Sequence, residues 1–138
     1  MNRHADIAFL ALTIWREARG ESPDAKLAVA WCIKNRVNRP SWWGSDILSV
    51  VFKKWQFSSL TDPKDPQLTT WPQSNDKSWI ESLDVAEKAL TWATGHPAPG
   101  ADSYYDISIA TPKWANDRNF VKQIGKLRFY NVDMDTEV

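Results

Sequence analysis

Cysteine and histidine are scarce in this sequence, and their scarcity excludes several kinds of site. Cys32 is the one cysteine, so no internal disulfide can form and the fold must rest on packing. It lies in an apolar run over residues 27–33, where a thiol is typically a small buried hydrophobe rather than a nucleophile. His4 and His96 are far apart, and neither an HExxH spacing nor a glycine-rich phosphate loop is present. We therefore expect a site that uses no metal and no cofactor.

Net charge and long apolar runs are lacking as well. Seventeen basic residues balance seventeen acidic ones, which disfavours binding to nucleic acid or to an anionic membrane. No run of eighteen apolar residues occurs, and no apolar signal region follows Met1. We expect a protein that is made in a cytoplasm without a signal peptide and does not insert stably into a membrane.

Tryptophan is the residue that the sequence has in excess. The length of 138 residues, with 43% hydrophobic and 25% charged residues, predicts a single domain over residues 1–138, which we expect to be monomeric. Nine tryptophans are more than a core of this size needs, so some should be partly exposed. Flat apolar rings beside polar groups suit the C–H faces of sugars, although packing in the core or at its rim is the ordinary role of each one.

Apolar spacing and capping residues predict four helices. The first two cover Arg3 to Ala18 and Pro23 to about Asn38, the second being stopped by Pro40 and buried on most sides. A shorter helix follows Ser45 or Asp46, and a longer one covers about Asp76 to Thr94. The proline-rich stretch over residues 62–72 reads as a surface loop, and residues 97–100 as a turn.

The last third of the chain has strand-forming residues. Strands are expected at Ser103 to Ile107 and within Phe120 to Val132, where Gly125-Lys126 resembles a two-residue hairpin turn. The predicted fold class is α+β, mainly α, with a small β region.

Glu17 is the most informative residue, because it places a carboxylate on the last turn of an otherwise apolar helix. The negative end of the helix dipole disfavours a second negative charge there. If the side chain is also partly buried, both effects raise its pKa, as a general acid working near neutral pH requires. The alternative is an ordinary surface ion pair with Arg16, Arg19 or another cation.

Several short motifs, taken in order, resemble the SleB/CwlJ-type cell wall hydrolases. The resemblance begins with the run Glu17-Ala18-Arg19-Gly20-Glu21 and extends, in blocks that keep the family's order, over residues 7–130. The further blocks are Leu27-Ala28-Val29-Ala30, Asn35-Arg36-Val37, Gln56-Phe57-Ser58, Tyr104-Tyr105, Trp114, Ile124-Gly125 and Phe129-Tyr130.

This resemblance implies a lysozyme-like helical domain that cleaves peptidoglycan glycan strands at the β-1,4 bond between N-acetylmuramic acid and N-acetylglucosamine. It identifies Glu17 as the catalytic glutamate. Several members are lytic transglycosylases, in which one carboxyl protonates the leaving oxygen and then takes the proton of the sugar's 6-hydroxyl, giving a 1,6-anhydro product. A hydrolytic muramidase with the same glutamate stays open, and Glu21, Asp62 and Asp106 are candidates for its second carboxylate. From another class, a non-catalytic peptidoglycan-binding module would use the tryptophans equally well.

Four further residues are predicted to contact substrate. Gln56 and Ser58, two apart on a segment expected to be extended, would face the same side and bond an N-acetyl group or the attacking hydroxyl, with Phe57 in the core. Tyr104 and Tyr105 alternate faces in the same way, so one should pack inward and the other should stack on or bond to sugar.

The sequence also departs from the resembled family. Many members carry a signal peptide, a separate wall-binding domain and histidines around the aromatic pair, none of which is found here. This favours a bacteriophage endolysin over an enzyme of spore germination. Such a protein would accumulate in the host bacterial cytoplasm until its release to the periplasm or cell wall, where it would lyse the host cell.

Overall fold

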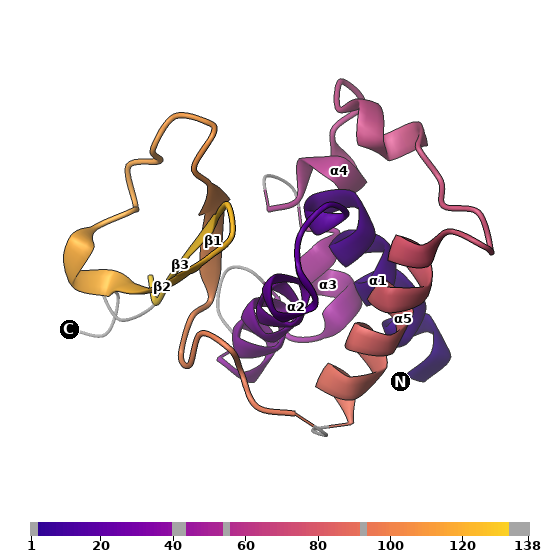
Figure 1. Ribbon diagram of the computed structural model, residues 1–138, viewed down its shortest axis with the longest axis horizontal. Helices are drawn as coiled ribbons and strands as arrows, with labels where there is room; N and C mark the ends of the chain where they lie inside the picture. Colours follow the sequence, from indigo (N-terminus) through magenta and orange to yellow (C-terminus); the bar gives the residue numbers. More distant parts are fainter. Residues whose placement is uncertain (1–2, 40–43, 54–55, 92–93, 133–138) are drawn as a thin grey trace.

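Helices form one side of the molecule and a small sheet forms the other (Figure 1). The computed structural model describes residues 3–39, 44–53, 56–91 and 94–132. Its helices are α1 (Arg3–Ala18), α2 (Pro23–Asn38), α3 (Ile47–Val51), α4 (Ser58–Thr61) and α5 (Lys77–Leu90), with 3-10 turns η1 (Pro66–Thr69) and η2 (Asp117–Asn119). Its strands are β1 (Ser103–Asp106), β2 (Phe120–Ile124) and β3 (Leu127–Tyr130). A mainly helical fold with a small β region is thus confirmed.

Side-chain caps start the helices where the sequence predicts them. The Ser22 hydroxyl accepts from the Ala25 N–H ahead of α2, and Asp46 forms a capping box with Ser49 at α3. Asp76 accepts from the first backbone N–H groups of α5. This last helix ends at Leu90 instead of Thr94, where the Thr91 backbone N–H and hydroxyl both bond to the Glu87 carbonyl. Two residues of these predictions, Pro40 and Ala93, lie outside the described residues.

The core lies between α1 and α2, and α5 packs against both. Leu10 and Ile14 of α1 and Val29 and Ile33 of α2 are fully buried. Cys32 shares this core, and burial raises the pKa of its thiol far above the ordinary value, so the thiolate that a nucleophile needs does not form. The predicted core role of Cys32 is confirmed.

The sheet is antiparallel with the strand order β1-β3-β2, and Tyr104 of β1 pairs with Phe129 of β3. Gly125 has φ +60 and allows the tight turn between β2 and β3 that its sequence predicted. Two side chains of α2 hold the start of β1: Asn35 Nδ2 donates to the Ala101 carbonyl at 2.8 Å, and Arg36 Nε donates to the Asp102 carbonyl at 2.7 Å. The sheet is therefore fixed against the helices at the strand that carries the two tyrosines.

Candidate active site

The carboxyl group of Glu17 lies where three segments meet. It extends from the last turn of α1, and its Oε1 accepts a hydrogen bond from the Tyr104 hydroxyl of β1 at 2.9 Å. Its Oε2 accepts a hydrogen bond from the Ser59 hydroxyl of α4 at 2.8 Å. The side chain keeps some exposed surface, as an acid that must reach a substrate requires.

Burial raises the pKa of Glu17 above its ordinary value, because the charged carboxylate has lost most of its water. The hydrogen bonds from Ser59 and Tyr104 and the positive charge of Arg36 act in the opposite direction, while the negative charge of Asp65 adds to the increase. Burial is the largest of these effects, so the net direction is upward. The same burial, together with the neighbouring carboxylate, raises the pKa of Tyr104, which therefore stays a hydrogen-bond donor.

The two arginines that flank Glu17 have other partners. Arg16 is buried and donates to the carbonyls of Ser59, Leu68 and Thr70 at 3.0, 3.1 and 3.2 Å. Arg19 donates to Gln67 Oε1 and lies over the Trp15 ring, 3.9 Å from its centroid. Neither arginine forms the surface ion pair with Glu17 that was one alternative to catalysis.

The prediction that Gln56 and Ser58 share one face is wrong, because the chain turns into α4 at Ser58. Ser58 is exposed, and its hydroxyl donates to Asp65 Oδ2 at 2.7 Å. The next residue, Ser59, is buried and faces Glu17. Phe57, predicted to be core, is only 3% exposed. Sequence reasoning missed Ser59, since a single helical turn is too short to show a period.

Gln56 lies beside Arg36, which donates from Nη1 to Gln56 Oε1 at 2.6 Å. This bond fixes the orientation of the amide, because a guanidinium can only donate. Gln56 Nε2 is then left as a buried donor without a hydrogen-bond partner in the described part of the chain. Such a donor is costly to leave unpaired, and it could bind a carbonyl or hydroxyl oxygen of a ligand.

The two tyrosines face opposite sides of the sheet, as predicted. Tyr104 packs inward, with its ring 5.8 Å from that of Phe129 and its hydroxyl on Glu17. Tyr105 joins an aromatic cluster on the outer face, where its ring lies 6.1 Å from Trp114 and 5.9 Å from Tyr130. Contact of either residue with sugar remains a prediction.

The three candidates for a second carboxylate each accept a hydrogen bond from a backbone N–H group in a turn. Glu21 Oε1 accepts from the Lys126 backbone N–H in the hairpin turn at 3.2 Å. Asp62 accepts from the Lys64 N–H, and Asp106 from the N–H and hydroxyl of Ser108. Asp65, which the sequence did not single out, is the acidic residue whose charge acts on Glu17.

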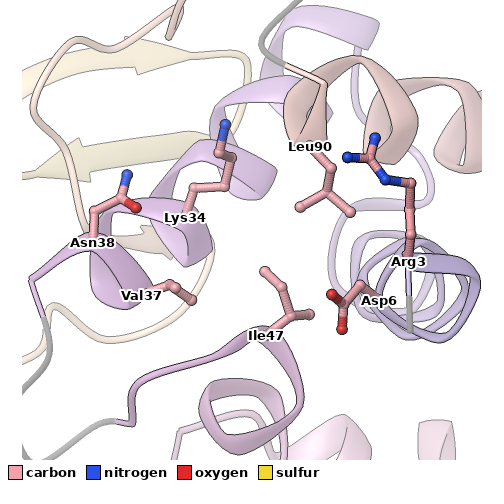
Figure 2. A pocket seen from close by; sticks show the side chains of 7 residues that line it. All are labelled: Arg3, Asp6, Lys34, Val37, Asn38, Ile47 and Leu90. Atoms are coloured by element: carbon pink, nitrogen blue, oxygen red, sulfur yellow. The ribbon is translucent and has the colours of Figure 1, made fainter. Parts of the chain in front are cut away.

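A cavity of about 290 Å³ opens at the other end of α1, away from Glu17 (Figure 2). Arg3 and Asp6 of α1 and Lys34 and Val37 of α2 are among its lining residues, and none of the predicted site residues is. Across the described ranges, no group of three or more histidine, cysteine or acidic side chains could hold a metal ion. No helix in those ranges is long and apolar enough to cross a membrane.

Comparisons with known proteins identify the family of this chain. The model of the Cell Wall Hydrolase family matches residues 20–130, which is more than half of the chain, and the chain belongs to that family. The spore cortex-lytic enzyme of Oceanobacillus iheyensis is 31% identical over 121 residues, which are 88% of this chain and 40% of that protein. The enzyme of the same name from Halalkalibacterium halodurans is 30% identical over 128 residues, 91% of this chain and 34% of that protein.

The fold resembles the catalytic domain of the germination-specific lytic transglycosylase SleB from Bacillus anthracis, with a TM-score of 0.72 and 26% identity. That likeness covers 94% of this chain and 96% of the solved domain. The chain therefore corresponds to the catalytic domain in that comparison, and spans 34–40% of the length of the curated relatives named above.

Proposed function

We propose that this chain cleaves the glycan strands of peptidoglycan by lytic transglycosylation, with Glu17 as its acid and base. The observation that carries the proposal is the Glu17 carboxyl itself, which is raised in pKa by burial and held by Ser59 and Tyr104. Membership of the Cell Wall Hydrolase family and the likeness to a lytic transglycosylase domain support the choice of substrate and reaction.

The reaction begins with Glu17 protonated. It donates its proton to the glycosidic oxygen between N-acetylmuramic acid and N-acetylglucosamine, and the C1–O bond breaks as positive charge develops at C1. Glu17, now a carboxylate, takes the proton of the 6-hydroxyl while O6 bonds to C1. The product is a 1,6-anhydro sugar and no water is consumed. The hydroxyls of Ser59 and Tyr104 stabilise the carboxylate between the two steps, since each donates to one of its oxygens.

Transglycosylation is favoured over hydrolysis because it needs one carboxyl group. Ordinary hydrolysis by glycosidases uses two, placed on either side of the bond. Glu21, Asp62 and Asp106 each accept hydrogen bonds from turn backbone, and no contact joins them to Glu17 in the described residues. Asp65 is likewise occupied, by the Ser58 hydroxyl and the Gln67 N–H. A hydrolytic muramidase that uses Glu17 is the second candidate, and the nature of the products separates the two.

Gln56 is proposed as a substrate-binding residue. Its Nε2 group would donate to the oxygen of an N-acetyl group, because Arg36 already occupies the amide oxygen. Replacement by alanine should weaken activity less than loss of Glu17 does. An unfolded Gln56→Ala protein would assign the residue to structure instead. Substrate contacts by Ser58 and Tyr105 stay predictions, since Ser58 is bonded to Asp65 and Tyr105 lies in the outer aromatic cluster.

Mass spectrometry of the soluble fragments released from purified peptidoglycan tests the proposal. Wild type should release fragments with anhydro-muramic ends. Glu17→Gln should reduce their rate of release by about 10²–10⁴-fold, because an amide cannot supply the proton. The exposed Glu87 of α5 provides a matched control, since Glu87→Gln makes the same chemical change far from the site. Reducing muramic ends would instead make the protein a hydrolytic muramidase, and near-normal release by Glu17→Gln would refute the assignment of Glu17.

The wall that the chain attacks is a separate question. The sequence predicts a bacteriophage endolysin that accumulates in the host cytoplasm, whereas the relatives described above are named as spore cortex-lytic enzymes. We retain the endolysin role as part of this proposal. It predicts faster release of fragments from vegetative cell walls than from isolated spore cortex, and a preference for cortex would exclude it.

A further inference from the structure

Among the tryptophans in the described part of the chain, Trp71 stands out because its ring is left largely open to solvent. Its side chain belongs to a residue that is 66% exposed, whereas Trp15 and Trp31 are buried and Trp79 and Trp114 are partly buried. Singly exposed apolar side chains are common on protein surfaces, so the significance of this ring depends on how it is held. One face of the ring is occupied, since the Arg16 guanidinium carbon lies 4.5 Å from the ring centroid.

Arg16 supports one face of this ring and is itself held in place by hydrogen bonds. Its guanidinium group is fixed by three backbone carbonyls, those of Ser59, Leu68 and Thr70. Thr70 directly precedes Trp71, so the same arginine holds both the backbone before the tryptophan and one face of its ring. A preorganised ring loses little conformational entropy when a ligand binds, which favours its use as a binding surface.

The same network leads to the catalytic carboxyl. Ser59 accepts from Arg16 through its carbonyl and donates to Glu17 through its hydroxyl. A single residue therefore connects the arginine under the Trp71 ring to the Glu17 carboxyl. The loop that contains residue 71 runs beyond α4, on the side away from the sheet (Figure 1). Trp71 is therefore separated from Glu17 by Arg16 and Ser59, one step away from the position at which the bond would be cut.

We propose that the exposed face of Trp71 is a stacking platform for a sugar ring of the glycan strand, outside the two sugars that flank the cleaved bond. This inference rests on the proposed function and extends it to a longer substrate. A β-1,4-linked strand of pyranose rings presents flat C–H faces, which pack on an aromatic face while the hydroxyl edges stay in water. The platform makes long strands better substrates than short ones, because it adds a contact with the polymer away from the cleaved bond.

Binding of a protein that cannot cut the strand tests the platform separately from catalysis. Glu17→Gln is mixed with purified insoluble peptidoglycan and the bound fraction is measured by sedimentation. Adding Trp71→Ala to this variant should weaken binding by about tenfold, the effect expected for loss of one well-placed tryptophan. Trp71→Phe should retain most of the binding, because a flat ring remains. Ile109→Ala is the matched control, since Ile109 is 62% exposed and lies after β1, so it should change nothing.

Kinetics supply the second measurement. In the active protein, Trp71→Ala should raise KM on polymeric peptidoglycan and leave kcat unchanged. It should have no effect on a disaccharide of N-acetylmuramic acid and N-acetylglucosamine, which fills only the two sugars around the cut. Unchanged sedimentation or an equal loss with Ile109→Ala would overturn the platform, as would a fall in kcat on both substrates. Concentration-dependent dimers that disappear with Trp71→Ala would overturn it too, because the ring would then contact a second copy of the chain instead of a sugar.

The outcomes also separate this inference from the proposed function. Wild-type protein that binds peptidoglycan through Trp71 but releases no fragments would refute the catalytic proposal and support the platform. Fragments released at normal KM by Trp71→Ala would support the catalytic proposal and overturn the platform. A wild-type protein that neither binds nor cuts peptidoglycan would overturn both.

Discussion

Tyr104→Phe removes one of the two hydrogen bonds to the Glu17 carboxyl, the proposed acid. The substitution removes the donor that lies 2.9 Å from Glu17 Oε1 and keeps the ring that packs on Phe129. A hydrogen bond to a charged group contributes about 1.5–3 kcal/mol. Because only the ionised carboxyl gains the full bond, its loss should shift the ionisation equilibrium of Glu17 toward the protonated form by about tenfold or more.

The pH dependence of kcat/KM reports this shift. Glu17 must be protonated in the free protein to act as an acid, so activity falls as the pH rises through its pKa. In Tyr104→Phe that fall should occur at higher pH. The neighbouring Tyr105 faces the outer side of the sheet, so Tyr105→Phe is the matched control and should leave the fall where it is in wild type. A fall at unchanged or lower pH in Tyr104→Phe would refute the argument that Tyr104 stabilises the carboxylate.

Three further predictions follow from the described contacts. The pKa of Glu17 is higher in the folded than in the unfolded chain, so the stability due to its neutral carboxyl is present at low pH and lost as the pH rises through the raised pKa. Glu17→Gln cannot ionise, and its melting temperature should therefore exceed that of wild type by a margin that grows with pH; a margin that shrinks with pH would contradict the burial of the carboxylate. Asp65→Asn removes a negative charge that raises the pKa of Glu17, so the fall of kcat/KM should move to lower pH, with unchanged anhydro products in mass spectrometry. A loss of all products would show that Asp65 takes part in the chemistry. Gly125→Ala should destabilise the fold by about 1–2 kcal/mol in urea unfolding, because Gly125 has φ +60 and an added Cβ would lie 2.7 Å from Glu21 Oε1. Gly20→Ala meets no atom within 4 Å and should be close to neutral, and equal effects of the two would argue against the backbone explanation.

Four of the helices, α1, α2, α3 and α5, could be predicted because each carries local signals, whereas α4 was not predicted. Ser22 with Pro23, Asp46, and Asp76 mark helix starts, and the structure has a helix beginning after each of them. The end of α5 could not be placed from apolar spacing, since the pattern continues past Leu90 while the Thr91 backbone N–H and hydroxyl bond back to the Glu87 carbonyl. Local capping was therefore a better guide than periodicity at this boundary.

Glu17 could be singled out from the sequence, but its partners could not. A carboxylate at the end of an apolar helix is visible in the local pattern, whereas Ser59 and Tyr104 come from 42 and 87 residues further along the chain. The prediction for Ser58 failed because alternation of side chains holds only for extended chain, and α4 begins at that residue. The same alternation held for Tyr104 and Tyr105, because they do lie on a strand.

Glu17 receives one hydrogen bond from Ser59 of the helices and one from Tyr104 of the sheet. Its pKa therefore depends on how the sheet is placed against the helices. Because β1 and α4 both contact the carboxyl, little water reaches it, and this burial raises its pKa. The placement of the sheet against the helices therefore contributes to the acid strength of Glu17, and a substitution at this contact would change the pKa of Glu17 without altering the residue itself.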